Sequence, residues 1–470
     1  MMKSDSDPII AVATALGRGG IGIVRLSFPS TLNEVILKSL FGDRQVEPRY
    51  ATLINYKNCH GEQLDQLIAL FFPAPHSYTG ESVIELQAHG GGVLLQMIVR
   101  DCLERLAPYG LRFAEAGEFT QRAFLNGRID LLQAEAVTDV IDAMSSEAAK
   151  VAVKSLSGKF SEVISNIGTR LDELRAFIEA TLDFPEEEVE HLQSGHIEER
   201  LHQIQNDFHQ VYRNAQQGSV LRDGLTVAII GSPNVGKSSL MNCLAEEDIA
   251  IVTDVPGTTR DKIECWITLA GVPIKVVDTA GIRQTDDIVE NKGIERALGE
   301  IRKADVVLHL RDASGQVEQD PALLAKVLSE VKEGTPLLTV WNKSDLCWRE
   351  DVGNDLRISV KTNEGIDALR EYLIKLAGVE STTEGIYMAR ERQLKCLIET
   401  NKHIDRALES LQHQLGLEIV AEELRLAGRS LGEILGETVS DDILGLIFSK
   451  FCIGKSVSYT HLRAHETEAD

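Results

Sequence analysis

The first part of the chain alternates short apolar runs with glycine and proline. Four runs read as strands, IIAVATAL, IGIVRLS, LIALFF and SVIELQ, and one segment with helical spacing, VLLQMIVRDCLERL, lies among them. Short strands separated by turn-forming residues, together with a helix, are typical of an α+β domain. The pattern therefore predicts an α+β domain over residues 1–122.

A long helical pattern follows from about Ala134. Its apolar positions recur every three or four residues and so share one face of an amphipathic helix: Val153, Leu156, Phe160, Ile164, Ile167, Leu171, Leu174 and Ile178. Pro185, in the acidic stretch DFPEEEVE, cannot continue a helix and marks its end. A polar helical stretch then extends to Gln216–Ser219, so residues 123–216 are predicted to form the first part of a helical domain.

The pattern changes again at Leu225. Buried strand-like runs, LTVAII, PIKVVD, DVVLHL, PLLTVW and LRISV, alternate with helical runs through about Ala377, as in a doubly wound α/β domain. Helical spacing then returns at Leu394, Leu397, Ile404, Leu408, Leu411 and Leu415. A lone helical segment would leave its apolar face uncovered. We therefore expect residues 381–455 to complete the same helical domain, with residues 217–380 inserted into it.

Composition narrows the class of protein. A chain of 470 residues suggests two or three domains, and 43% hydrophobic with 26% charged residues is ordinary for a folded, soluble protein. The chain has neither an apolar run long enough for a membrane span nor a secretory signal. Its seven cysteines are scattered without a CxxC pair, which argues against a disulfide framework or a zinc site and favours a reducing cytoplasm. The net charge of −24 implies that any nucleic-acid contact is local or delegated to a partner.

The segment GSPNVGKSSL (Gly231–Leu240) follows the run LTVAII and opens a helix, which is the context of a phosphate-binding P-loop. Its glycines let backbone N–H groups surround phosphate oxygens. Lys237 supplies a positive charge, and the Ser238 hydroxyl can ligate Mg²⁺. The predicted nucleotide contacts in this segment are Asn234, Val235, Gly236, Lys237, Ser238 and Ser239.

Three later motifs each follow a predicted strand. They are DTAG (Asp278, Thr279, Ala280 and Gly281), NKSD (Asn342, Lys343, Ser344 and Asp345) and SVK (Ser359, Val360 and Lys361). Asp278 can hold the metal, and the Gly281 N–H can face the γ-phosphate. Asp345 can accept both N1–H and the 2-amino group of guanine, which adenine does not offer. With SVK closing over the base mainly through its backbone, the motifs predict a domain that binds and hydrolyses GTP.

The segment TDVPGTTRD, between the P-loop and DTAG, suits a switch loop. Its predicted nucleotide contacts are Thr253, Asp254, Val255, Pro256, Gly257, Thr258 and Thr259, of which Thr259 reaches Mg²⁺ when the γ-phosphate is present. After DTAG the chain has Ile282, where Ras-type GTPases have a glutamine that orients the attacking water. Isoleucine has no hydrogen-bonding group. The residues alone leave Asp286, Asp287 and Glu290 open for that role.

Taken together, these phrases resemble the MnmE (TrmE) family of tRNA modification GTPases. The resemblance runs from Ile9 to Lys455 and includes GRGGIGIVRLS, SYTGESVIELQAHGG, GEFTQRAFLNGRIDLLQAEA, GSPNVGKSSL, TDVPGTTRD, DTAGIR, NKSD and FCIGK. It implies a multidomain α/β and α fold. An N-terminal α+β domain binds folate and dimerises, and a helical domain is interrupted by an inserted Ras-like P-loop domain.

The resemblance also implies partners and a second cofactor. Family members form a homodimer and act with the flavoprotein MnmG (GidA), in a heterotetramer, on certain tRNAs. They add an aminomethyl or carboxymethylaminomethyl group to carbon 5 of the wobble uridine, using 5,10-methylene- or formyl-tetrahydrofolate. By motif match Arg25, Glu85, Arg128 and Lys455 contact the folate, and Cys452 takes part in the modification. Arg128 replaces the usual lysine, which keeps the charge and changes the donor geometry.

By the same resemblance, K⁺ and dimerisation of the G domains take the place of an arginine finger in GTP hydrolysis. Asn234 and backbone groups around Thr253, Val255 and Thr258 correspond to the potassium site. A cation between phosphate oxygens can neutralise the charge that develops in the transition state. The role of positioning the water falls on Glu290.

Two other functions compete with this interpretation. A ribosome-assembly or translation GTPase would use its flanking domains only to bind RNA, and a strongly basic appended domain would favour it. A non-catalytic GTP-dependent switch is disfavoured by Lys237, Asp278 and the candidate glutamate. Residues 456–470 continue past the family pattern as a polar, aperiodic stretch, which we interpret as a non-native, disordered tail.

Overall fold

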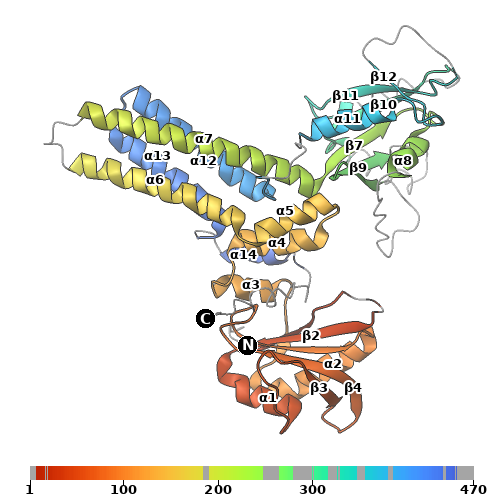
Figure 1. The fold of residues 1–470 in the computed structure, drawn as a ribbon, viewed down its shortest axis with the longest axis vertical. Coiled ribbons are helices and arrows are strands. Elements are labelled where there is room, and N and C mark those ends of the chain that lie inside the picture. The colour runs from red at the N-terminus through yellow and green to blue at the C-terminus, as the bar shows by residue number, and fades with distance from the viewer. Residues whose placement is uncertain are drawn as a thin grey trace, which may run out of the picture. The chain divides into compact units, whose positions relative to one another are not determined.

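The computed structural model describes the chain in segments that fall into two compact units (Figure 1). The described residues are 7–15, 17, 19–183, 190–246, 264–278, 299, 301–315, 325, 329–346, 355–378, 385–437, 441–449 and 451. The first unit comprises Met1–Thr138, Ile164–Gly168 and Gly428–Asp470, and the second comprises Asp139–Val163 and Thr169–Ala427. No helix among the described residues is long and apolar enough to cross a membrane.

The first unit is built on a six-stranded sheet with the order β3-β4-β5-β2-β1-β6. Its strands are β1 (Ile9–Val12), β2 (Ile21–Phe28), β3 (Thr52–Lys57), β4 (Gln63–Phe72), β5 (Ser82–His89) and β6 (Arg112–Phe113). Two helices, α1 (Asn33–Phe41) and α2 (Gly92–Leu106), pack against it, and two 3₁₀ turns (Ser30–Leu32 and Ala107–Tyr109) connect the elements. The predicted α+β class is confirmed, although the sequence patterns missed α1, β3 and β6.

The two faces of this sheet differ in chemistry. Val24, Leu26 and Phe28 of β2 belong to the apolar core that includes residues of α1 and α2. Because side chains alternate along a strand, Arg25 and Ser27 lie on the opposite face. Both are buried nonetheless. The sheet therefore has one apolar face covered by helices and a second face that carries buried polar groups.

The C-terminal part of the first unit packs beside the helix that follows the sheet. Helices α3 (Glu118–Leu125), α4 (Leu131–Asp142) and α14 (Asp441–Ser449) share an apolar cluster that includes Leu131, Phe448 and Phe451. Gly117 has φ +68°, and a Cβ there would lie 2.6 Å from the carbonyl oxygen of Phe448. This close approach, which requires glycine, holds the end of α14 against the start of α3.

The helical part of the chain comprises α5 (Ser146–Leu156), α6 (Lys159–Asp183), α7 (Glu190–Asp223), α12 (Glu391–Gln412) and α13 (Leu417–Leu435). Most of it belongs to the second unit, but Ile164–Gly168 of α6 and residues 428–435 of α13 belong to the first. The helices α7 and α12 flank the inserted α/β segment in sequence and lie side by side (Figure 1). Gln205 of α7 donates to Asp405 of α12 over 2.7 Å. The predicted interruption of one helical domain by an α/β domain is thereby confirmed.

Two details of the predicted helices are wrong. The single helix expected from Val153 to Ile178 is broken into α5 and α6 by Ser157 and Gly158, because Gly158 adopts the left-handed φ of +86° that ends a helix. Val153 is consequently 45% exposed and does not belong to the buried face. Leu415 lies after the end of α12 and is 58% exposed, because the chain turns there toward α13.

The second unit also holds a six-stranded sheet with the order β12-β11-β10-β7-β9-β8. Its strands are β7 (Leu225–Ile230), β8 (Glu264–Leu269), β9 (Val272–Asp278), β10 (Val306–Asp312), β11 (Leu337–Asn342) and β12 (Leu356–Arg357). Two helices of the same α/β segment are α8 (Lys237–Glu246) and α11 (Ile366–Ala377). All neighbouring strands are parallel except β8, which is antiparallel to β9 and was not predicted. The carboxyl ends of β7, β9 and β11 therefore meet at one edge, where α/β proteins bind ligands.

Candidate functional site

The P-loop follows β7 and has the backbone strain expected of a phosphate cradle. Asn234 has φ +65° and Gly236 has φ +101°, both in the left-handed region. A Cβ at Gly231 would lie 2.3 Å from the carbonyl oxygen of Leu310 on the neighbouring strand. Lys237 is buried, and its Nζ donates to the carbonyls of Gly231 (2.7 Å) and Ser232 (3.1 Å). Its positive charge thus lies within the curve of the loop.

The P-loop runs directly into α8, which begins at Lys237. The first N–H groups of a helix have no partner within the helix, and its dipole favours an anion at this end. Ser238 and Ser239 are exposed in the first turn. A hydroxyl oxygen is the type of ligand that Mg²⁺ accepts. This geometry suits a nucleotide phosphate with its metal.

Asn342, at the end of β11, links the P-loop to the loop that carries SVK. Its Nδ2 donates to the carbonyl of Val235 over 2.9 Å, and its Oδ1 accepts from the backbone N–H of Val360 over 3.2 Å. The side chain is buried, and a Cβ at Gly236 would lie 2.3 Å from its Nδ2. Asn342 therefore fixes the spacing between the phosphate-binding loop and a loop at the far end of the same edge.

The carboxylate of Asp345 is held in one orientation by Ser359. The Ser359 hydroxyl is completely buried and donates to Asp345 Oδ1 over 2.8 Å. The same Ser359 oxygen accepts from the backbone N–H of Thr362, and the N–H of Ser344 donates to the carbonyl of Ile358. Asp345 itself is exposed. The structure thus brings NKSD and SVK together around one exposed carboxylate, and Lys361, two residues after Ser359, is exposed as well.

One supporting residue at this edge was missed by the sequence patterns. Asp312 ends β10 beside Asn342, and its Oδ2 accepts from Lys343 Nζ over 2.8 Å. Burial alone would raise the pKa of Asp312, but hydrogen bonds from Lys343 and Ser314 hold it below its ordinary value. Lys343 has φ +65°, so this ion pair stabilises a strained loop residue. The sequence did offer one indication of Asp312, because it lies just after the strand-like run DVVLHL, as the residues of the other motifs follow their runs.

In the first unit, Arg25 and Glu85 form a buried pair. They face each other across β2 and β5, and Glu85 Oε1 accepts from Arg25 Nε (2.9 Å) and from its terminal nitrogen (2.7 Å). Glu85 Oε2 is buried and has no hydrogen-bond partner among the described residues. An unsatisfied buried acceptor costs about 1–3 kcal/mol. The guanidinium lies 6.0 Å from the ring centroids of Tyr78 and Phe119.

Further ion pairs extend over the same part of the first unit. Glu81 accepts from Ser27 (2.6 Å) and pairs with Arg122 (2.9 Å). Arg122 also pairs with Glu118, which in turn binds Arg112. Burial would raise the pKa of Glu118, but its hydrogen bonds from Arg112 and Arg122 lower it. These contacts anchor the start of α3 to the polar face of the sheet.

Arg128 is exposed, and its side-chain carbons lie beside Gly80 in the SYTGES turn. A Cβ at Gly80, which has φ +79°, would come within 3.2 Å of Arg128 Cγ. Asn126 Nδ2 donates to the carbonyl of Thr79 over 2.7 Å. The segments SYTGES and NGR therefore meet, while Arg128 makes no part of the buried Arg25–Glu85 pair.

The other predicted site residues lie outside the described part of the chain. These are Thr253, Asp254, Val255, Pro256, Gly257, Thr258, Thr259, Thr279, Ala280, Gly281, Glu290, Cys452 and Lys455. Asp278 is described only as the last residue of β9.

Comparison with known proteins shows which family has this architecture. Residues 131–452 match the family model described as the MnmE helical domain, and residues 8–128 match that of the GTP-binding protein TrmE N-terminus. The chain belongs to the MnmE (TrmE) family. The tRNA modification GTPase MnmE of Burkholderia mallei (strain SAVP1) is 48% identical over 473 residues, covering 97% of this chain and all (100%) of the relative. The protein of the same description from Acidovorax sp. (strain JS42) is 47% identical over 470 residues, with the same coverage.

Membership of the MnmE family accounts for the order of domains along the chain. The match to the helical domain spans the inserted sheet, because that domain is continuous in space but not in sequence. Among solved structures, the FeoB G domain from Methanococcus jannaschii is 25% identical and covers 33% of this chain and 97% of its own, with a TM-score of 0.26. That score is too low to add to the family assignment.

Proposed function

We propose that this chain is a GTP hydrolase that modifies the wobble uridine of certain tRNAs. It acts as a homodimer with the flavoprotein MnmG (GidA), in a heterotetramer, and adds an aminomethyl or carboxymethylaminomethyl group to carbon 5. The observation that carries the nucleotide part is the Asn342 bridge between the P-loop and the loop of Val360, beside the Asp345 carboxylate oriented by Ser359. The family assignment supports the tRNA part.

Different residues at the sheet edge bind the phosphates, the metal and the base of GTP. Lys237 and the N–H groups at the start of α8 bind the phosphates, and Ser238 and Thr259 hold Mg²⁺. Asp345 accepts from N1–H and the 2-amino group of guanine. Because Ser359 occupies one side of Oδ1, the carboxylate faces the base in a fixed rotamer. Adenine has no hydrogen-bond donor at these two positions, so the Asp345 carboxylate would stay unpaired against it. The site therefore binds guanine in preference to adenine.

Hydrolysis depends on a cation and on a water held by a carboxylate. Asn234 is exposed on the P-loop with φ +65°, so its amide oxygen can serve as a ligand of K⁺. Backbone groups around Thr253, Val255 and Thr258 complete that site, and pairing of two G domains encloses it. Glu290 positions the attacking water, since Ile282 cannot.

The buried face of the first unit fits a folate. Glu85 Oε2 is a buried acceptor that lacks a partner among the described residues, and a pterin ring offers N–H donors to such an oxygen. Arg25 holds Glu85 in place, and Arg128 and Lys455 lie on segments that supply further positive charge. When bound, a 5,10-methylene- or formyl-tetrahydrofolate supplies the one-carbon unit.

The domain roles follow the predicted division of the chain. Residues 1–122 bind folate and dimerise, residues 123–216 and 381–455 form the helical domain, and residues 217–380 form the G domain. Residues 456–470 are a non-native tail. Cys452 acts in the modification step, and the protein works in the cytoplasm.

Mass analysis of tRNA wobble uridines tests the proposal. Cells that lack the gene should lose the carbon 5 group, and the wild-type chain should restore it, whereas Lys237→Ala and Glu85→Gln should not. Lys402→Ala, at a helix position where Lys402 pairs only with the exposed Glu399 in the described contacts, is the control and should restore it fully. Unchanged wobble uridines in the deletion strain, with a defect in ribosomal subunits instead, would refute the proposal.

A further inference from the structure

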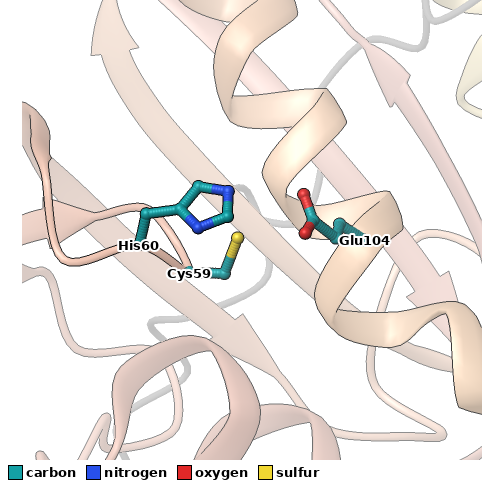
Figure 2. A group of neighbouring side chains, drawn as sticks. All are labelled: Cys59, His60 and Glu104. Carbon is teal, nitrogen blue, oxygen red and sulfur yellow. The ribbon is translucent and has the colours of Figure 1, made fainter.

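A turn and a helix in the first unit bring together a thiol, an imidazole and a carboxylate. Cys59 and His60 lie in the turn between β3 and β4, and Glu104 lies on α2. Figure 2 shows the Cys59 sulfur between the His60 ring and the Glu104 carboxylate. One ligand atom from each residue lies within 4.8 Å of the other two. All three side chains are exposed, so an ion can reach them from solvent.

We propose that Cys59, His60 and Glu104 form a binding site for Zn²⁺. Zinc accepts thiolate, imidazole and carboxylate ligands, whereas Mg²⁺ and Ca²⁺ prefer oxygen alone. With ordinary zinc–ligand distances, ligand atoms on one tetrahedral ion lie about 3.3–3.6 Å apart. Closing from 4.8 Å requires shifts of roughly 1 Å, which rotations of the exposed side chains supply. Water completes the fourth position.

The turn that carries the first two ligands is held by a non-ligand residue. Asn58 Oδ1 accepts from the backbone N–H groups of His60 (3.1 Å) and Glu62 (2.8 Å), and Asn58 Nδ2 donates to the Glu62 carboxylate (2.9 Å). Gly61, with φ +84°, closes the turn through its N–H to the carbonyl of Asn58. The ligands are thus presented by an ordered turn, which reduces the entropy cost of gathering them.

The turn is also tied to the helix that carries the third ligand. The backbone N–H of Cys59 donates to Asp101 Oδ1 over 2.7 Å, and Asp101 Oδ2 accepts from Tyr56 (2.6 Å) and Arg105 (2.8 Å). Asp101 is buried and its charge is paired with Arg105. Glu104, one helical turn from Asp101, remains to face the thiol.

Electrostatics favours a divalent cation between these groups. The Glu104 carboxylate supplies a negative charge and a thiolate at Cys59 would supply a second, while the neutral His60 imidazole supplies a lone pair. Zn²⁺ binds the thiolate and the thiol proton is released to solvent, so zinc affinity should increase with pH.

Zinc binding is measured on the full chain, freed of metal, by competition with a chromophoric chelator. Cys59→Ser, His60→Gln and Glu104→Gln should each lower the affinity more than Asn58→Ala, for which loss of the supporting contacts should cost about tenfold. Cys396→Ser is the matched control, because it removes a thiol from α12 and should leave the affinity unchanged. GTP turnover should be the same in all five variants, which shows that they are folded.

Two further readouts identify the ligands directly. Co²⁺ bound to the wild-type chain should give a thiolate charge-transfer absorption that Cys59→Ser lacks. Zn²⁺ should also slow alkylation of Cys59 in a peptide map and leave the rate at Cys243 unchanged. Equal zinc affinity and equal cobalt spectra in the wild type and Cys59→Ser, or alkylation of Cys59 at the same rate with and without zinc, would overturn the proposal. These readouts do not depend on tRNA modification.

Discussion

Replacing Asp345 with asparagine should change the base that the G domain prefers. In the structure, Ser359 donates to Asp345 Oδ1 over 2.8 Å and is itself completely buried. In Asp345→Asn the amide oxygen takes over this contact, so the NH₂ group faces the base. It then opposes the 2-amino group of guanine but matches the 2-oxo group of xanthine. Loss of two hydrogen bonds to a charged group, at about 1.5–3 kcal/mol each, weakens GTP binding about 10²- to 10⁴-fold.

The assay is equilibrium binding of GTP and xanthosine triphosphate to the full chain at fixed Mg²⁺. Ser359→Ala should weaken both the guanine preference of the wild type and the xanthine preference of the variant, because the side chain at position 345 loses its orientation. Asp367→Asn is the control: this carboxylate is on α11 of the same domain, its side chain is 91% exposed, and its change should leave binding unaltered. An unchanged guanine preference in Asp345→Asn would refute the assignment of NKSD as the base-reading loop.

Four further predictions concern turnover and the end of the chain. GTP turnover should be faster in K⁺ than in Na⁺ at equal ionic strength, because Na⁺ is too small to bridge the same oxygens; equal steady-state rates would exclude the potassium site at Asn234. Glu290→Ala should lower kcat while leaving GTP affinity nearly intact, since it acts on the transition state; normal hydrolysis in single-turnover assays would move the role to Asp286 or Asp287. Gly236→Ala places a Cβ 2.3 Å from Asn342 Nδ2 at φ +101° and should weaken GTP binding about ten- to hundredfold. Gly378→Ala, at φ +64° in open space, is the control for backbone strain and should bind GTP normally in the same titration. Cys452→Ser should impair tRNA modification without changing GTP turnover, whereas truncation after Lys455 should preserve both; loss of modification on truncation would make the tail a functional part of the protein.

The G domain was predictable in detail because its local and global patterns agree. The central strands β7 and β10 are buried on both faces and contain apolar runs, and each motif follows a strand end. Parallel strands bring those ends to one edge of the sheet. The order of strands and motifs along the chain is therefore enough to predict that Lys237, Asn342 and Asp345 lie at the same edge. The antiparallel β8 was missed because its continuous apolar run, CWI, is only three residues long and lies between Glu264 and Thr268.

The helical domain shows where periodicity misleads. The apolar spacing continues across Ser157 and Gly158 without a break, yet the chain ends one helix and starts another there. The break is caused by the left-handed φ of Gly158. A single glycine within a helical pattern does not by itself indicate that the helix ends there. Similarly, Gly218 lies inside α7 because the backbone of Tyr387 passes so close that a Cβ would fall 1.8 Å from its carbonyl oxygen. No local pattern contains that contact.

The sites of the first unit were harder to predict from the sequence. Arg25 and Glu85 were singled out only by resemblance to a family, because nothing local indicates that two strands pair at that register. Cys59, His60 and Glu104 gave no pattern at all: the scattered cysteines argued against zinc, and the third ligand comes from a distant helix. A ligand set assembled by tertiary structure cannot be found from spacing along the chain.

The last described residues of the chain pack beside the start of α3, which also contacts the buried polar face of the first unit. Gly117 admits the backbone of Phe448 and the side chain of Phe451, and Phe119, two residues after Gly117, lies 6.0 Å from the Arg25 guanidinium. Phe451 directly precedes Cys452 in FCIGK. Since α14 packs against α3 and α4, Phe448→Ala should loosen this cluster and destabilise the part of the chain that leads into FCIGK. We therefore expect Phe448→Ala to reduce tRNA modification while leaving GTP binding at the G-domain edge intact.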